Sequence, residues 1–210
     1  MNVILFDFDG TIVDSVDVGV EITNRLALEF GFPPFDQATL EELKNLGSRG
    51  ALKRSKIPVW KLPFLIRRFT AELNREIPHL ELFPEMKETL LELKQQGNFL
   101  GIVSTNSIKN IQEFLRVQNL TSTFDVISAS YSLFGKSRLI QKIMRQQKLQ
   151  PSQIYYVGDE TRDIEAAKTS GVNSIATTWG LNSAEILLQH HPDFLIDCPK
   201  ELLNLLIDKA

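Results

Sequence analysis

The sequence predicts an α/β protein, a Rossmann-like parallel sheet core with an inserted all-helical cap domain. Short apolar runs rich in Val, Ile and Phe alternate with longer segments of helical periodicity, which is the pattern of βα units around a parallel sheet. After the first run, a stretch of roughly 65 residues has no strand signal and is too long for an ordinary crossover connection. A chain of 210 residues has room for a core domain that carries a smaller insertion.

Six apolar runs are the predicted strands of the sheet. Each is short and is followed by a segment of helical periodicity, as expected for strands buried on both faces. They run over residues 2 to 6, 99 to 104, 124 to 128, 154 to 158 and 174 to 178, with a weaker last strand near Phe194 to Ile196.

The segment from 84 to 96 illustrates the helices predicted between strands. Pro84 suits the first turn, where a backbone N–H has no helical partner. Leu90 and Leu93 fall on one face, and Gly97 can end the helix. The helix delivers the chain into the next strand.

Domain boundaries follow from the strand-free stretch. We expect the catalytic core to comprise residues 1–15 and 82–210 and the helical cap to comprise residues 16–81. The linkers are expected near Ile12 to Val16 and near Pro78 to Pro84.

The cap segment carries its own helical signals. Residues 17–31 place apolar side chains at near-helical spacing, and Thr39 with Glu42 fits a capping box. A further helix is expected over residues 58–75. We expect a small bundle that buries the aromatic side chains of this helix, namely Trp60, Phe64 and Phe69.

Charge and composition argue against several function classes. The formal net charge of -3, with both signs interspersed, provides no long-range field for nucleic acid or anionic lipid. The sequence has no run of roughly 18 apolar residues and no secretion signal, and its one cysteine, Cys198, has no internal partner for a disulfide. We therefore expect a cytoplasmic protein without nucleic-acid or membrane partners, either a monomer or a homodimer.

The first chemical signal is Asp7-Phe8-Asp9-Gly10-Thr11, which directly follows the first predicted strand. Ligands of open parallel sheets bind at the carboxyl ends of the strands. Carboxylates separated by one residue repel each other unless a cation or a proton lies between them, which indicates Mg²⁺ or acid–base chemistry. Gly10 allows a sharp turn. The simpler alternative is that the motif is only a turn after a strand.

The second signal is Gly158-Asp159-Glu160-Thr161-Arg162-Asp163, which follows the strand at 154 to 158 and opens a helix. The spacing of four residues brings Asp159 and Asp163 to one helix face, where they could complete an oxygen-ligand site for Mg²⁺. Acidic capping of a helix start is the alternative.

Two weaker signals lie between them. Ser104-Thr105-Asn106 closes the strand at 99 to 104 with groups able to hydrogen-bond a phosphate, although such residues are often only N-caps. Lys136 is expected at a helix start, where the helix dipole favours an anion, so this lysine indicates an anionic partner. A solvated surface lysine is the alternative.

In this order the motifs resemble those of the haloacid dehalogenase superfamily. The chain is most similar to phosphoglycolate-phosphatase-like members, which have a helical cap inserted after the first motif, and the resemblance covers almost the whole chain. It implies a mobile cap over the site. The matching residues are Asp7-Phe8-Asp9-Gly10-Thr11-Ile12-Val13-Asp14-Ser15, Ser104, Lys136 and Gly158-Asp159 with Asp163.

The resemblance implies a role for each motif residue. Asp7 would attack phosphorus, and Asp9 would protonate the leaving oxygen and then activate water. Ser104 and Lys136 would hold the phosphoryl oxygens, Ser104 being favoured over its neighbour Thr105 for the hydroxyl. The ligands of Mg²⁺ would be Asp7, the backbone carbonyl of Asp9 and Asp159, with Asp163 assisting through water or as a further ligand. The groups expected around the substrate, a small phosphorylated metabolite, are Gly10, Thr105, Asn106 and Arg49.

Other functions remain open at this stage. A phosphosugar mutase uses the same four motifs and a similar cap, and a non-catalytic module could bind Mg²⁺ and phosphate in the same acidic pocket. Retention of Asp9 argues against dehalogenation, because dehalogenating members replace this aspartate.

Arg49 is the one predicted specificity residue. It lies in Gly47-Ser48-Arg49-Gly50, which the sequence predicts to be a flexible turn between two cap helices. By resemblance this region faces the active site, and an arginine suits a leaving group that carries a carboxylate, as 2-phosphoglycolate does. The alternative is that Arg49 is a solvated cation like Lys53 and Arg54.

Overall fold

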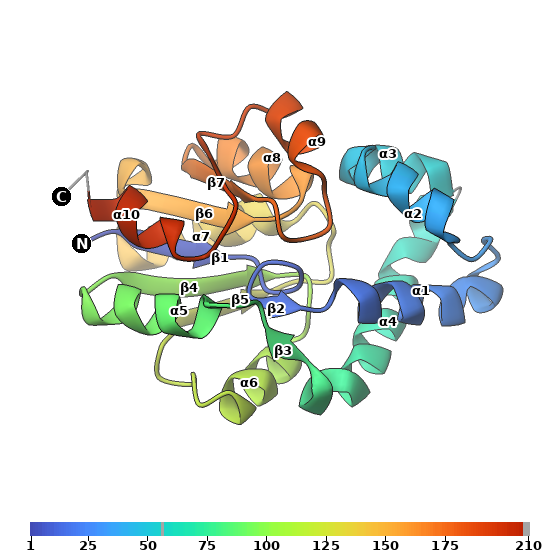
Figure 1. The fold of residues 1–210 in the computed structure, drawn as a ribbon, viewed down its shortest axis with the longest axis horizontal. Coiled ribbons are helices and arrows are strands. Elements are labelled where there is room, and N and C mark those ends of the chain that lie inside the picture. The colour runs from blue at the N-terminus through green and yellow to red at the C-terminus, as the bar shows by residue number, and fades with distance from the viewer. Residues whose placement is uncertain (56, 208–210) are drawn as a thin grey trace.

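The computed structural model describes residues 1–55 and 57–207. Its centre is a parallel sheet of six strands in the order β5-β4-β1-β6-β7-β8, which confirms all six predicted strands to within two residues at each end (Figure 1). The strands are β1 (Val3–Phe6), β4 (Phe99–Ser104), β5 (Val126–Ala129), β6 (Ile154–Gly158), β7 (Asn173–Thr177) and β8 (Phe194–Ile196).

Both faces of this sheet are covered by helices, because its side chains alternate between two apolar layers. Ile4 and Phe6 pack in the layer that includes α5 (Met86–Gln95) and α6 (Ile108–Val117). Val3 and Leu5 point the other way. They pack in the layer formed with α7 (Lys136–Gln147) and α8 (Thr161–Ser170). Two further helices, α9 (Ala184–Gln189) and α10 (Glu201–Ile207), follow β7 and β8.

The predicted helix at 84 to 96 is confirmed as α5, with a later start. Glu85 has a left-handed backbone, with φ of 65°, and the helix begins at the next residue. Gly97, with φ of 80°, follows its end in the same left-handed conformation, as the sequence predicted.

Within the described residues, four α-helices lie between β1 and α5. They are α1 (Val16–Phe30), α2 (Gln37–Lys44), α3 (Gly47–Ser55) and α4 (Leu62–Glu76), with short 3₁₀ turns at Val59–Lys61 and Ile77–His79. We call this segment the helical insertion. It lies beyond the strand ends at which the arrowheads point (Figure 1).

A two-stranded antiparallel ribbon joins the insertion to the sheet. β2 (Val13–Asp14) precedes α1, β3 (Glu81–Leu82) follows the insertion, and Val13 pairs with Leu82. The sequence did not predict this ribbon, because two residues per strand are too few for an alternating pattern.

Three predictions for the insertion are wrong. The N-cap of α2 is Asp36, whose Oδ1 accepts the N–H of Thr39 at 2.8 Å, so Thr39 lies inside the first turn and does not start a capping box with Glu42. The segment from Gly47 to Gly50 is the first turn of α3, not a flexible connection.

The third correction concerns the aromatic side chains. Phe69 packs against the core, but Trp60 and Phe64 are 69% and 63% exposed. Leu65, Phe69 and Leu73 repeat every four residues along α4 and form the face that packs against the core. Phe64 points away from that face, and Trp60 lies in the 3₁₀ turn before the helix.

Within the described residues, no helix combines the length and the apolar character that a bilayer crossing needs.

Candidate active site

Three strand ends bring the predicted site residues together. Asp7 follows β1, Ser104 ends β4 and Asp159 follows β6, and these three strands are neighbours at the centre of the sheet. The N–H of Asp7 donates to the carbonyl of Val157 at 2.8 Å, which continues the pairing of β1 with β6 beyond the last strand residue.

A buried carboxylate cluster is the main feature of the site. Carboxylate oxygens of Asp7, Asp159 and Asp163 lie within 4.8 Å of one another, and each residue is at most 2% exposed. Burial raises the pKa of all three carboxyl groups, that of Asp163 to about 6. For Asp159, the negative charges of Glu160, Asp7 and Asp163 raise the pKa further. The cluster is therefore suited to a cation that compensates these charges.

Lys136 supplies one such positive charge. Its Nζ donates to Oδ2 of Asp7 and, at 2.6 Å, to Oδ1 of Asp163, and the residue is 2% exposed at the start of α7. Burial acts to lower the pKa of Lys136, but the charges of Asp163 and Asp7 outweigh it and raise the pKa. The alternative of a solvated surface lysine is therefore wrong.

Asp159 is held in place by tight packing. Thr11 Oγ1 donates to its Oδ1 and the N–H of Leu181 donates to its Oδ2, both at 2.8 Å. A Cβ atom at Gly10 would lie 2.4 Å from Asp159 Oδ2, and one at Gly180 would lie 2.3 Å from Asp159 Cβ. Glycine at these two positions therefore leaves room for the carboxylate.

The donor set fits a hard divalent cation such as Mg²⁺. All three clustered side chains offer oxygen, which Mg²⁺ prefers to nitrogen or sulfur ligands, and neither histidine nor cysteine belongs to the described cluster. The carboxylate of Asp9 lies outside this cluster and has other partners.

Those partners fix the carboxylate of Asp9. Asn106 Nδ2 donates to its two oxygens at 3.0 and 3.3 Å, and Ser15 Oγ donates to Oδ1 at 3.3 Å. Ser15 is the N-cap residue of α1, but its hydroxyl makes no capping bond. Burial raises the pKa of Asp9 in spite of the hydrogen bonds from Asn106 and Ser15.

The motif Ser104-Thr105-Asn106 at the end of β4 supplies a side chain of the pocket wall and the residue that holds Asp9. Ser104 is 1% exposed, and its Oγ accepts the N–H of Asn106 at 2.9 Å. Thr105 is less buried and lines the pocket next to the carboxylates. Asn106 holds Asp9 with one end of its amide, and with Oδ1 it accepts from the N–H of Ser107 and from Asn110 Nδ2, at 2.7 and 3.0 Å.

Arg162 is a site residue that sequence reasoning missed. Its Nε donates to Glu160 Oε1 at 2.9 Å, its Nη1 reaches the carbonyl of Leu133 at 3.4 Å, and the side chain lines the pocket. Burial acts to lower the pKa of Arg162, but nearby charges, first that of Glu160, raise it. The sequence signal that could have identified Arg162 is its position as a basic residue between the acidic residues Glu160 and Asp163.

Arg49 lies on the outer side of the site. Its Nε and Nη2 bind the carboxylate of Glu165 in α8 at 2.9 to 3.1 Å, and its guanidinium carbon lies 4.6 Å from the centre of the Phe134 ring. Arg49 is absent from the described lining of the pocket. Its predicted contact with the substrate remains a prediction.

Contacts at α2 also join the insertion to the core. The N–H of Ser183 donates to the carbonyl of Lys44 at 3.2 Å, and Ser183 Oγ donates to Asn45 Oδ1 at 2.5 Å. The insertion is thus hydrogen-bonded to the segment that follows β7.

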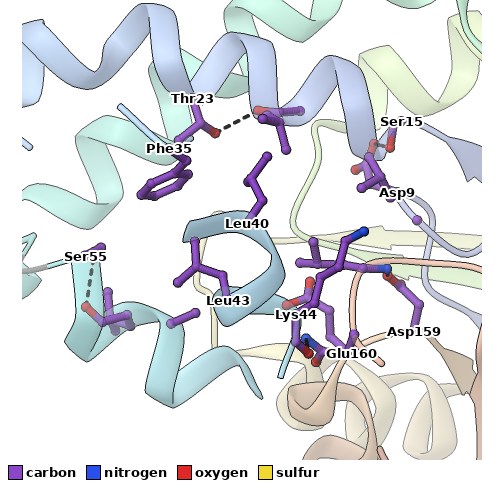
Figure 2. A pocket seen from close by; sticks show the side chains of 18 of the residues that line it. Asp9, Ser15, Thr23, Phe35, Leu40, Leu43, Lys44, Ser55, Asp159 and Glu160 are labelled. Atoms are coloured by element: carbon purple, nitrogen blue, oxygen red, sulfur yellow. Dashed lines mark hydrogen bonds between the residues drawn. The ribbon is translucent and has the colours of Figure 1, made fainter. Parts of the chain in front are cut away.

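Between core and insertion lies a pocket of about 430 Å³. Asp9, Asp159 and Glu160 form part of its wall at the core, and side chains of α1, α2 and α3 form most of its wall at the insertion (Figure 2). A ligand held at the carboxylates would extend toward the insertion.

Known proteins resemble the chain over nearly all of its length. A family model described as haloacid dehalogenase-like hydrolase matches residues 4–177. A phosphoglycolate phosphatase of Synechococcus elongatus is 38% identical over 204 residues, covering 97% of this chain and 96% of the relative. A pyrophosphatase named PpaX from Bacillus thuringiensis is 28% identical over 214 residues, covering 99% and 97%. The solved structure of a haloacid dehalogenase-like family hydrolase from Streptococcus pneumoniae matches with a TM-score of 0.77 at 25% identity, covering 98% of each chain.

Proposed function

The chain belongs to the haloacid dehalogenase-like hydrolase family, and we propose that it is a Mg²⁺-dependent phosphatase of small phosphomonoesters that forms an aspartyl phosphate on Asp7. The observation that carries this proposal is the contact of Asp7 with Lys136 inside a buried carboxylate cluster, two residues before a second, separately held carboxylate, Asp9. The proposed acid–base group, Asp9, lines the pocket, and the proposed nucleophile lies two residues before it in the chain.

In the first step, an oxygen of Asp7 attacks phosphorus and the bond from phosphorus to the leaving oxygen breaks. Asp9 donates its proton to that oxygen. The raised pKa of Asp9 favours the protonated form that this step needs. In the second step Asp9 takes a proton from water, whose oxygen attacks the phosphoryl group, and Asp7 is released with inorganic phosphate.

Charge on the transferred group would be balanced by the residues around it. Lys136 would neutralise phosphoryl oxygens beside Asp7, and Arg162 would add a second, partly buried positive charge. A Mg²⁺ ion held by Asp7, Asp159, Asp163 and the carbonyl of Asp9 would supply further neutralisation when bound.

We favour Thr105 over Ser104 as the hydroxyl that contacts phosphate. Thr105 lines the pocket, whereas Ser104 is buried beneath it and accepts the N–H of Asn106. We also propose that residues 16–81 act as a cap that covers the site during turnover.

2-Phosphoglycolate is the first substrate to test, because of the name of the 38% identical relative. The assay measures inorganic phosphate released from 2-phosphoglycolate and from p-nitrophenyl phosphate, with Mg²⁺ and after chelation. Asp7→Asn should abolish steady-state turnover of both, since an amide is a poor nucleophile. Asp197→Asn, an exposed aspartate outside the site, is the matched control.

Three outcomes would contradict the proposal. Turnover by purified Asp7→Asn would exclude the nucleophile, and full activity after chelation would exclude the metal site. Isomerisation of a hexose 1-phosphate without net phosphate release would identify a phosphosugar mutase instead.

A further inference from the structure

The pocket extends well beyond the carboxylates into the helical insertion. Its wall there comes from α1, α2, α3 and the loops beside them, and most of its side chains are apolar. They include Val20, Phe35, Leu40, Leu43, Leu52 and Phe69, all of them only partly buried and therefore open to a ligand.

Polar side chains in this part of the pocket are bonded to their own helices. Thr23 Oγ1 donates to the carbonyl of Gly19 at 2.7 Å, and Ser55 Oγ donates to the carbonyl of Leu52 at 2.8 Å (Figure 2). Their hydroxyl protons face backbone carbonyls and are not offered to a ligand. Because these hydroxyl groups are already paired, the deep part of the pocket presents mainly apolar surface to a ligand.

The charged side chains of the pocket wall come from the core, from Lys44 of α2 and from Asp17 in the first turn of α1. Among the described lining residues of the insertion, Lys44 is the one cation, and it lies toward Asp159 and Glu160 (Figure 2). Arg162 lies on the same core side. A carboxylate placed deep among the leucines would lose its hydration without gaining a partner, which is strongly unfavourable.

We propose that this part of the pocket binds an apolar chain on the leaving group, so that the substrates include phosphomonoesters of alcohols with an extended aliphatic chain. The inference rests on the proposed phosphatase function, since it requires the phosphoryl group at Asp7. The volume of about 430 Å³ lies within the range of sites that enclose a whole metabolite and exceeds what a two-carbon acid fills. Contact with the apolar wall removes methylene groups from water and so strengthens binding with each added carbon.

The test compares kcat/KM for ethyl, butyl and hexyl phosphate with kcat/KM for 2-phosphoglycolate. We expect kcat/KM of the wild-type enzyme to rise about two- to fourfold for each added methylene. Ala51→Phe places a large side chain into the pocket wall of α3 and should lower kcat/KM for hexyl phosphate at least tenfold while changing that for ethyl phosphate less than about twofold.

Lys53→Phe adds the same side chain on an exposed position of the same helix and should keep the wild-type chain-length profile. If thermal unfolding shows that Ala51→Phe does not fold, Leu40→Gln replaces it and should reduce the gain per methylene. A flat chain-length profile in the wild-type enzyme overturns the inference, and so does an equal loss for ethyl and hexyl phosphate in the folded variant. Absence of hydrolysis for every phosphomonoester would instead refute the phosphatase function itself.

Discussion

Asn106 donates from Nδ2 to both carboxylate oxygens of Asp9, and its Oδ1 accepts from Asn110 in the first turn of α6. Asn110 Nδ2 also donates to the carbonyl of Thr70 in α4 at 3.0 Å, while Asn110 Oδ1 accepts from Asn74 Nδ2 at 2.6 Å. The proposed acid–base group is therefore linked to a helix of the insertion through two buried amides.

Asn110→Leu tests whether this link positions Asp9. The substitution removes the hydrogen bonds to Asn106 and to α4, and we expect kcat to fall roughly 5- to 30-fold, the effect of one or two lost hydrogen bonds. KM should change little. Gln112→Leu on the exposed side of α6 is the matched control. A loss of stability with unchanged kcat would show that Asn110 is only structural.

The acid–base role of Asp9 predicts a dependence on the leaving group. Asp9→Asn keeps Asp7 and Lys136 but cannot protonate the leaving oxygen, so alkyl phosphates should lose about 10²- to 10⁴-fold in kcat. p-Nitrophenyl phosphate should lose much less, because its leaving group needs no proton. Equal losses for both substrates in steady-state assays would contradict this role.

Magnesium should stabilise the protein increasingly as pH rises. A carboxyl group whose folded pKa lies above its unfolded value stabilises the fold at low pH, and this contribution is lost as pH rises through the folded pKa. For Asp163 the pKa is 3.8 in the unfolded chain and about 6 in the fold, so the metal-free protein should lose the stabilisation from this group between pH 3.8 and about pH 6. A bound cation opposes the loss by compensating the ionised cluster.

Thermal unfolding with Mg²⁺ and with EDTA, from about pH 4 to about pH 7, measures this difference. We expect the gain in Tm with Mg²⁺ to grow over the interval and to be largely absent in Asp159→Asn. A gain of the same size in that variant would place the metal elsewhere.

The ion pair of Arg49 with Glu165 allows a test of whether this arginine acts structurally or contacts the substrate. If Arg49 mainly holds α3 against α8, Arg49→Ala and Glu165→Ala should each lower kcat/KM by a similar factor, roughly two- to fivefold, for both 2-phosphoglycolate and p-nitrophenyl phosphate. We expect this outcome from the observed ion pair. Loss on 2-phosphoglycolate alone, with Glu165→Ala unaffected, would support the substrate contact inferred from the sequence.

The sequence predicted those parts of the fold and of the site that have a long local pattern. Strands such as β1 and β6 are continuous apolar runs, and chemistry-bearing residues directly after them must meet at one sheet edge, so the neighbourhood of Asp7 and Asp159 could be predicted. Partners far apart in sequence, such as Asn110 with Thr70, leave no local signal. The same applies to Arg49, which pairs with a residue 116 positions away.

Local signals also failed where two rules competed. Asp36 and Thr39 both suit an N-cap, and in the structure Asp36 takes this position and accepts the N–H of Thr39. Glycine at 47 and 50 favoured a turn, yet a helix begins at Gly47, where φ is 64°. Propensity is a weak guide when tertiary contacts hold the segment.

The ribbon of β2 and β3 brings the entry and the exit of the helical insertion next to each other. Because Val13 pairs with Leu82, the insertion is in effect a long loop of a β-hairpin. The entropy cost of closing such a loop grows only slowly with its length. The segment between these two points can therefore change in length at little entropic cost, as long as α4 keeps its contacts with Asn110.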